Sequence, residues 1–459
     1  MNKQKLAAAI ALAALSLHVQ ADDAAKPQGF LEDSKLSLSS RTYYYENDDH
    51  SANGINQRET VETLKLDYKS GFTQGLIGVG VDAQLIYGLH LDGGPGHHPG
   101  TGNSFWPSDS DNSAQDDVAR GDANVKFRVS KTELHVGGAL FPQMPIMMAT
   151  DSRTMPQNFD GGMITSREID NLTLNAGQLE HSTGRASTNS TSLSVAGATE
   201  GSNQFRYAGA DYKVTKDLTV QYYRANLQDF YTQNFFGLIH VLPLGDDQSF
   251  KTDLRYFSSS SDGKNSSGTA GYAFNNNGGY AKHANEVDNV TWSTMFTYQL
   301  GGSKFMLGYQ SVSDDGGFVM LNQGNVTNNG KSLATNGSNS EDNGGTSFYL
   351  YTNSVIGSFI RAGEDTSFGQ YTYDFARVGV PGLSAFVSYL RGDNIKDKTL
   401  NGVNHTEWER DAGVDYVFQS GYLKGFGTTL RTGSYHAGGT GVANQDQTRL
   451  IFNYTYNFL

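Results

Sequence analysis

The chain lacks cysteine altogether, and only 9 of its 459 residues are proline. The absence of cysteine excludes a disulfide scaffold, thiol catalysis and zinc–thiolate sites. Long apolar runs are also missing, because nothing beyond the N-terminus approaches the roughly 18 residues that a membrane-spanning helix needs. No Pro-rich or charged linker divides the chain. These absences exclude a helical membrane protein and leave one uniform domain.

The N-terminus has the features of a secretory signal peptide. Lys3 and Lys5 precede an apolar core, which ends at small residues suited to cleavage after Ala21. The sequence thus predicts a signal peptide over residues 1–21 and a mature domain over residues 22–459. Removal of the signal peptide takes the net charge from −13 to about −15. An acidic exported chain is a poor candidate for nucleic-acid binding.

The mature chain alternates between apolar and polar side chains with period two. Residues 77–91 are one example, and residues 125–129, 250–256 and 292–300 show the same pattern. This alternation predicts half-buried β-strands. Eighteen strands can be counted, with starts near Lys35, Val61, Gly75, Asp122, Glu133, Gly161, Leu172, Gln204, Leu218, Tyr231, Gln248, Val290, Lys304, Ser367, Leu383, Glu407, Phe426 and Gln447.

The connections between these strands are alternately short and long. Short ones include residues 130–132, 215–217 and 301–303, whereas the long ones are rich in Asn, Gly, Ser and Asp. The long loops are residues 92–121, 181–203, 258–289, 321–345 and 437–445. Short turns at one end and long loops at the other are typical of a transmembrane β-barrel. A sheet in lipid must close, because an open edge would leave peptide groups unpaired.

The outer face of such a barrel must be apolar, so the charged face of each strand is expected to look into the lumen. The cations on that face are Arg41, Lys65, Lys126, Arg128, Lys251, Arg255 and Arg431. Each could be a solvated wall charge paired with a neighbouring carboxylate, or a station on an anion path. The final segment, RLIFNYTYNFL, is expected to be the closing strand, with its aromatic residues facing lipid and Arg449 facing the pore.

Several stretches resemble the OprD family of outer-membrane porins, which are substrate-specific channels. They span nearly the whole mature chain in order: GFLEDSKLSLSSRTYYYEN, SGFTQGLIGVGVDA, VSKTELHVGG, MPQNFDGGMITSREIDNLTLNAGQ, VSDDGG, YDFARVGVPGL, RGDN, EWERDAGVDYVFQSGYLKG and the terminal RLI.

The resemblance implies an 18-stranded antiparallel transmembrane β-barrel, monomeric or loosely trimeric, in the outer membrane of a Gram-negative cell. A loop after the fifth strand, here Phe141–Gly162, folds inward as a constriction loop and carries Asp151 and Arg153. A basic ladder leads carboxylate-bearing solutes through the pore. The residues assigned to it here are Arg41, Lys126, Arg128, Arg255 and Arg431, with Asp314 and Asp315 as acidic candidates opposite.

Two positions depart from the family pattern. Gln370 and Thr429 stand where relatives commonly have basic residues, which thins one side of the ladder. The departure leaves the substrate open between basic amino acids, aromatic or cyclic acids, and others. Acidic residues in an outer loop, such as Asp109 and Asp111, would attract cationic groups. Solutes that bear both charges would fit both features.

The function expected from the sequence is therefore passive, substrate-selective diffusion of small carboxylate-containing solutes into the periplasm. Catalytic residues, cofactors and metals are not expected, and the other partners are outer-membrane lipid, lipopolysaccharide and the outer-membrane assembly machinery. Two alternatives are a barrel hydrolase, meaning a protease or phospholipase, and a secreted adhesin or β-solenoid. The hydrolase would need a Ser/His/Asp cluster, although no GxSxG elbow occurs. The solenoid would need a fixed-length repeat, which is not found.

Overall fold

The computed structural model describes residues 29–321, apart from 53, 94, 95, 101, 102 and 110, then 327–328, 331–332 and 347–459. The predicted signal peptide, and most of the predicted long loop at residues 321–345, lie outside the described residues.

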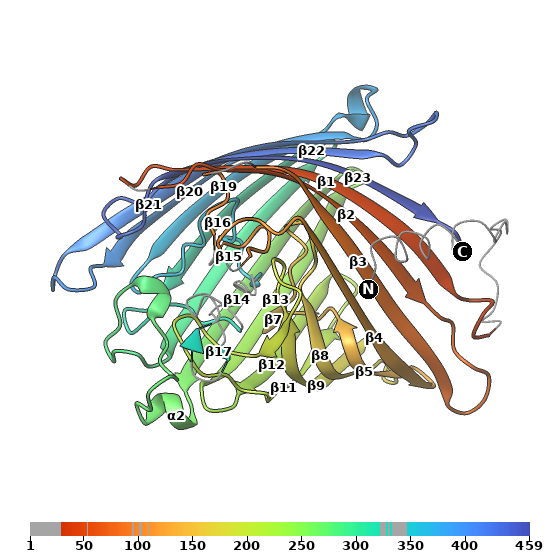
Figure 1. The fold of residues 1–459 in the computed structure, drawn as a ribbon, viewed down its shortest axis with the longest axis horizontal. Coiled ribbons are helices and arrows are strands. Elements are labelled where there is room, and N and C mark those ends of the chain that lie inside the picture. The colour runs from red at the N-terminus through yellow and green to blue at the C-terminus, as the bar shows by residue number, and fades with distance from the viewer. Residues whose placement is uncertain are drawn as a thin grey trace.

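Eighteen long strands form a closed antiparallel barrel (Figure 1). They are β1 (Lys35–Asp49), β2 (Gln57–Lys69), β3 (Gly78–Asp92), β4 (Asp117–Val129), β5 (Thr132–Leu140), β8 (Asn158–Ser166), β9 (Leu172–Thr183), β11 (Phe205–Lys213), β12 (Leu218–Leu227), β13 (Tyr231–Gly245), β14 (Gln248–Ser261), β15 (Asp288–Leu300), β16 (Ser303–Val312), β19 (Asp365–Asp374), β20 (Leu383–Lys396), β21 (Asn404–Val417), β22 (Gly427–His436) and β23 (Gln445–Asn457).

Short elements decorate the connections. They are β6 (Gln143–Met144), β7 (Met147–Met148), β10 (Ser190–Ser192), β17 (Thr327–Asn328), β18 (Lys331–Ser332), α2 (Gly263–Ser266), η1 (Asn276–Gly278) and η2 (Phe375–Val378). Within the described residues, no helix is both long enough and apolar enough to cross a bilayer.

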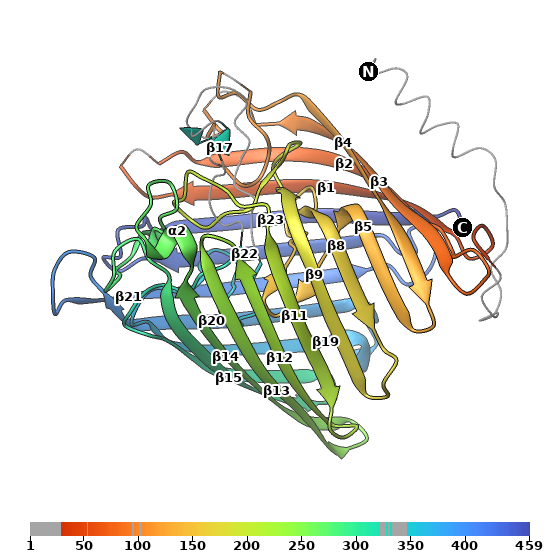
Figure 2. The same ribbon diagram turned by 90° about the horizontal axis from the view of Figure 1, so that it is seen from below.

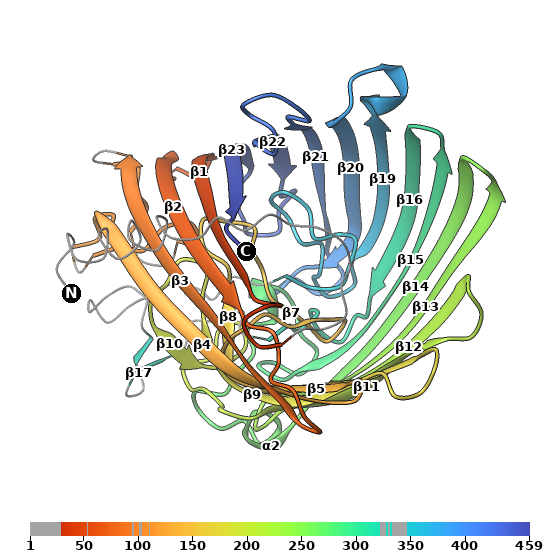
Figure 3. The same ribbon diagram turned by 90° about the vertical axis from the view of Figure 1, so that its right-hand side faces the viewer.

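The last strand closes the barrel by pairing with the first. The register between β1 and β23 runs from Ser37 opposite Asn457 to Asp49 opposite Gln445, so no edge remains open. Figure 1 and Figure 3 both show the two strands side by side. The predicted closing strand is confirmed. Every predicted strand start lies within five residues of an observed one.

The two faces of the wall differ as the period-two pattern predicts. Leu85 is 47% exposed and Phe236 is 51% exposed on the outer face, whereas Ile86 is buried on the inner face. One outer row of aromatic residues crosses four neighbouring strands in register, since Tyr222 pairs with Phe236, Phe236 with Tyr256, and Tyr256 with Trp292. We call these four residues the aromatic row. Such a band is typical of the boundary between hydrocarbon and headgroups.

The long loops all leave the same end of the barrel, and several of them fold into it. Residues 141–157, 184–204, 313–321 and 347–364 supply buried apolar side chains that pack on the inner face of β9 to β14. These strands contribute Phe205, Tyr231, Phe235 and Phe257, which are fully buried. The largest apolar core therefore fills the side of β9 to β14, and two smaller apolar clusters line the walls of β1 to β4 and of β15 to β22. The sequence predicted only one inward loop.

Candidate functional site: a charged constriction

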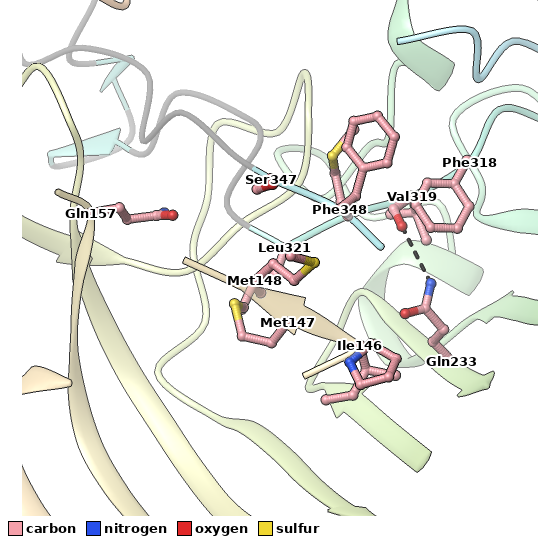
Figure 4. A pocket seen from close by; sticks show the side chains of 12 residues that line it. Ile146, Met147, Met148, Gln157, Gln233, Phe318, Val319, Leu321, Ser347 and Phe348 are labelled. Atoms are coloured by element: carbon pink, nitrogen blue, oxygen red, sulfur yellow. Dashed lines mark hydrogen bonds between the residues drawn. The ribbon is translucent and has the colours of Figure 1, made fainter. Parts of the chain in front are cut away.

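The predicted constriction loop is held inside the barrel by a second loop. Residues 141–157 form its free part, and residues 158–162 belong to β8. Met147 lines a small pocket together with Phe318 and Phe348 of the loop between β16 and β19 (Figure 4). Gln233 of β13 donates from Nε2 to the carbonyl oxygen of Val319 over 3.3 Å. The space left between the loops is about 10 Å³, close to the smallest volume that holds one water molecule.

Arg41 ties the constriction loop to the opposite wall. Its Nη1 lies 2.8 Å from Asp151 Oδ1 and also donates to the carbonyl oxygen of Arg153 over 2.6 Å. Arg41 and Asp151 are thus brought together.

The other predicted ladder residues face the interior, and each has a carboxylate partner. Lys126 Nζ lies 2.6 Å from Asp82 Oδ1. Two arginines form similar pairs: Arg128 with Glu133 at 2.9 Å, and Arg431 with Asp415 at 2.7 Å. Thr429, one of the two departures, donates from Oγ1 to the same Asp415 over 2.7 Å. The positive charge of each of these residues is therefore largely neutralised by its carboxylate partner.

Arg255 is buried beneath the second inward loop. It donates to Asp253 from Nε over 2.7 Å, and its guanidinium lies 3.6 Å from the ring centre of Tyr349 and 4.0 Å from that of Tyr351. Only 7% of its side chain is exposed. Asp253 and the two tyrosine rings thus occupy the guanidinium, and this geometry anchors the loop.

The acidic candidates lie in the loop that follows β16. Asp314 Oδ2 lies 3.2 Å from Lys396 Nζ, and Asp315 Oδ1 lies 3.3 Å from Lys282 Nζ. The side chain of Asp314 is 72% exposed. The structure thus brings neither of them to the Arg41–Asp151 pair.

Several guanidiniums beside the constriction loop have no carboxylate partner among the described residues. Arg120 donates to the carbonyl oxygens of Pro156, Gly184 and Ser187, and we call the other three the guanidinium cluster (Arg153, Arg185 and Arg449). Arg185 donates to Ser152 Oγ and Ser104 Oγ, each over 2.9 Å. Arg153 lies over the ring of Tyr45, with 5.2 Å between its Cζ and the ring centre. Arg449 donates to Gln447 and to the carbonyl oxygen of Val355. Among the described residues, none of the three forms an ion pair with a carboxylate.

The cluster is electrostatically strained. Burial and the positive charges of Arg153 and Arg449 lower the pKa of Arg185 to about 9. The Nε atoms of Arg153 and Arg185 are buried and have no hydrogen-bond partner within the described part of the chain. A group of like charges with unused donors is a site for an anion.

This cluster was only partly predictable from the sequence. Arg153 was assigned to the constriction loop, and Arg449 was placed on the pore face by strand alternation. Arg185 was missed because it lies in residues 184–204, which read as a solvated polar loop. The sequence pattern of that loop holds no feature that separates an inward fold from an outward one.

A column of acidic side chains on β21 was also missed. Glu407, Glu409 and Asp411 all point inward and are nearly or fully buried. Glu407 Oε2 bonds Arg361 Nη1 and accepts from Tyr435. Glu409 accepts the backbone N–H groups of the second inward loop. These carboxylates stand on the strand next but one to Arg449, so opposite charges line neighbouring walls.

Below the constriction, the barrel widens into a cavity of about 920 Å³ at the short-turn end. Lys35, Lys65 and Lys69 line it together with Asp67 and Asp82. The space below the constriction is therefore a polar vestibule.

A closed barrel with an apolar outer face, a charged interior and an inward constriction defines an outer-membrane channel. The chain matches the family model for outer membrane porins of the OprD family over residues 28–458, and it belongs to that family. Its relatives are porins, which are channels and not enzymes.

Two curated relatives match along nearly their whole length. Porin D of Pseudomonas aeruginosa is 31% identical over 452 residues, covering 95% of this chain and 94% of the relative. The porin-like protein GalP of Pseudomonas putida is 30% identical over 436 residues, covering 94% of each.

Solved structures agree with the fold. The crystal structure of OccK8 (OprE) of Pseudomonas aeruginosa is 41% identical, with a TM-score of 0.80, and the match covers 94% of this chain and all of that one. The structure of OpdK of Pseudomonas aeruginosa with vanillate is 30% identical, with a TM-score of 0.77 and the same coverage. The expected family, fold and outer-membrane location are confirmed.

Proposed function

We propose that this porin passes small carboxylate-containing solutes, namely amino acids and aromatic or other organic acids, passively into the periplasm. The observation that carries the proposal is the guanidinium cluster, three cations beside the constriction loop without a carboxylate partner among the described residues. The carboxylate of a solute can therefore pair with these guanidiniums, which have no carboxylate partner in the described part of the protein. Cations that already bear carboxylates, such as Lys126 and Arg431, contribute less.

Arginine suits this role because its planar fork holds a carboxylate through two parallel hydrogen bonds. A permeating solute must also leave, so the binding must stay weak. Arg185 and Arg153 already spend part of their donor capacity on Ser152 and Ser104. This partial satisfaction moderates the affinity and supports passage rather than trapping.

The acidic column on β21 supports solutes that bear both charges. Arg449 and Glu409 flank the segment 354–357 of the second inward loop from two strands of the same wall. A zwitterion could align its carboxylate with the guanidinium cluster and its ammonium with the acidic side. The relative OpdK was solved with vanillate, an aromatic carboxylate, which keeps aromatic acids among the candidates for this chain.

A liposome-swelling panel tests the proposal. Purified protein would be compared for basic amino acids, aromatic acids and neutral solutes of matched size. We expect faster swelling with carboxylates than with their amides. Arg449→Gln should slow the carboxylates and leave the amides nearly unchanged. Equal rates for acids and amides in the wild-type protein would refute carboxylate selectivity and leave a general porin.

A further inference from the structure

Two arginines stand on the outer face of the barrel, next to the aromatic row. Arg224 follows Tyr222 by two residues on β12, and Arg206 lies on the neighbouring strand β11. Arg206 pairs in register with Asn226, so the two arginines are diagonal neighbours on one face. Diagonal neighbours across strands lie within reach of long side chains. Figure 2 shows β11, β12 and β13 as adjacent strands of one outer surface.

Both arginines are exposed and lack an ion-pair partner among the described residues. Arg224 donates from Nη1 to Asn234 Oδ1 over 3.2 Å. Arg206 donates from Nε to Gln178 Oε1 over 2.9 Å. Two acidic neighbours lie nearby: the Glu180 carboxylate accepts from Gln178, and the Asp262 carboxylate accepts from Asn226 over 3.0 Å. Both guanidiniums therefore keep their charge and several free donors.

The position of Arg206 and Arg224 relative to the aromatic row indicates which part of the membrane contacts them. The long connection of residues 184–204 enters β11 at Phe205, which pairs with Leu227 of β12, so this end of the two strands is the outer one. The aromatic row marks the outer limit of the hydrocarbon. Arg224 and Arg206 lie one and two steps beyond it, at the depth of the headgroups.

Other arcs of the wall lack this arrangement. Arg391 on β20 also faces outward, but Asp393 neutralises it at 2.9 Å. At the seam between β1 and β23, the outward side chains are acidic, namely Asp48 and Asp446, each about half exposed.

Arg58 on β2 and Arg410 on β21 are also exposed on the outer face without a carboxylate partner among the described residues, but each stands singly. On β11 and β12, two such arginines lie diagonally on neighbouring strands.

We propose that Arg206 and Arg224 bind the phosphate groups of an outer-leaflet glycolipid, lipid A, whose acyl chains lie over the aromatic row. Arginine forms strong bidentate hydrogen bonds with phosphate. Asn234 lies alongside Arg224 and supplies a polar contact to the sugar. The site is independent of what passes through the pore.

Native mass spectrometry of the full-length protein in detergent tests this site. Lipid A would be titrated against the wild-type protein, Arg206→Gln/Arg224→Gln and the matched control Arg391→Gln. We expect about a fivefold loss of affinity for each arginine removed, and less than about a twofold change for the control. The double variant Arg206→Lys/Arg224→Lys should keep much of the affinity, because it keeps the charge. The heat-dependent gel shift of folded barrels confirms that each variant is folded.

Two further arms separate lipid phosphate from other occupants. Lipid A from which the phosphates have been removed should bind the wild-type protein weakly. Its affinity should not exceed that of intact lipid A for Arg206→Gln/Arg224→Gln. Inorganic phosphate should not displace lipid A. Unchanged lipid A binding in the folded double variant would overturn the proposal. So would a changed oligomeric state with lipid binding intact, since the surface would then contact protein.

Discussion

Arg41 of β1 and Asp151 of the constriction loop form an ion pair across the lumen, with 2.8 Å between Nη1 and Oδ1. The pair joins a fixed wall to the loop that narrows the pore. Arg41 also donates to the carbonyl oxygen of Arg153, so the same guanidinium positions the guanidinium cluster. Loop position and pore charge are therefore coupled through one contact.

Asp151→Asn should make the channel more anion-selective. The substitution removes the charge that neutralises Arg41 and leaves its hydrogen bond to the Arg153 carbonyl in place. The reversal potential in a salt gradient should shift toward the anion value. Asp170→Asn is the control, because Asp170 is exposed in a turn at the short-turn end. A shift toward cations, or an equal shift in the control, would contradict the coupling.

Glu409→Gln should loosen the second inward loop. The fully buried Glu409 carboxylate accepts the backbone N–H of Ile356 over 2.7 Å and that of Gly357 over 2.6 Å. Glutamine offers one acceptor oxygen, so one buried N–H loses its partner at a cost of about 1–3 kcal/mol. Single-channel recordings should show larger and noisier conductance. Asp393→Asn, on the outer face, is the control and should leave the recordings unchanged. If Glu409→Gln gave the same conductance and noise as the wild-type channel, the loop would be held by other contacts.

Arg255→Ala should raise flux without regard to charge. Arg255 is covered by Tyr349 and Tyr351 and is paired with Asp253, so its removal frees the loop above it. Swelling rates for a carboxylate and its amide should rise together. Selective slowing of the carboxylate would instead place Arg255 on the solute path, as the sequence predicted.

Glu364 should make stability depend on pH. It is fully buried in the loop before β19, and burial, together with the charge of Glu407, raises its pKa well above the ordinary value. The folded protein then holds a proton that the unfolded chain releases near pH 4.3. The free energy of unfolding should consequently fall as the pH rises above about 4.3, until the folded pKa is passed.

Glu364→Gln should remove that part of the pH dependence and stabilise the protein at neutral pH. The unfolding midpoint in urea, followed from about pH 4 to about pH 8, measures this effect. Glu180→Gln, exposed on the outer face, is the matched control. A wild-type slope in Glu364→Gln would show that another group carries the proton.

Strand alternation was sufficient to predict the wall. A period-two pattern fixes which face each side chain takes, so Arg41, Lys126 and Arg431 could be placed in the lumen from the sequence. The carboxylates that pair with them could not be predicted in this way. The pairing of Lys126 with Asp82 depends on the register between β3 and β4, in which Gly80 lies opposite Lys126. The predicted strand starts differ from the observed ones by up to five residues, which is too imprecise to give that register.

The period-two pattern of the strands could not predict how the interior loops fold. Residues 184–204 are rich in Ser, Thr and Asn, which is typical of exposed loops, yet Leu193 and Ser194 are fully buried. Their polar groups are satisfied inside the barrel by neighbouring backbone. Such contacts arise only after the wall has closed, so Arg185 and the packing around Arg255 emerged from the structure alone.

The most direct test of the account is the flux ratio of benzoate to benzamide through reconstituted protein, because the two solutes match in size and differ in charge. The ratio should fall about tenfold or more in Arg153→Gln/Arg185→Gln/Arg449→Gln, since each arginine–carboxylate hydrogen bond contributes about 1.5–3 kcal/mol. It should change much less in Lys126→Gln, whose charge Asp82 already neutralises. An unchanged ratio in the folded triple variant would contradict a carboxylate path through the guanidinium cluster.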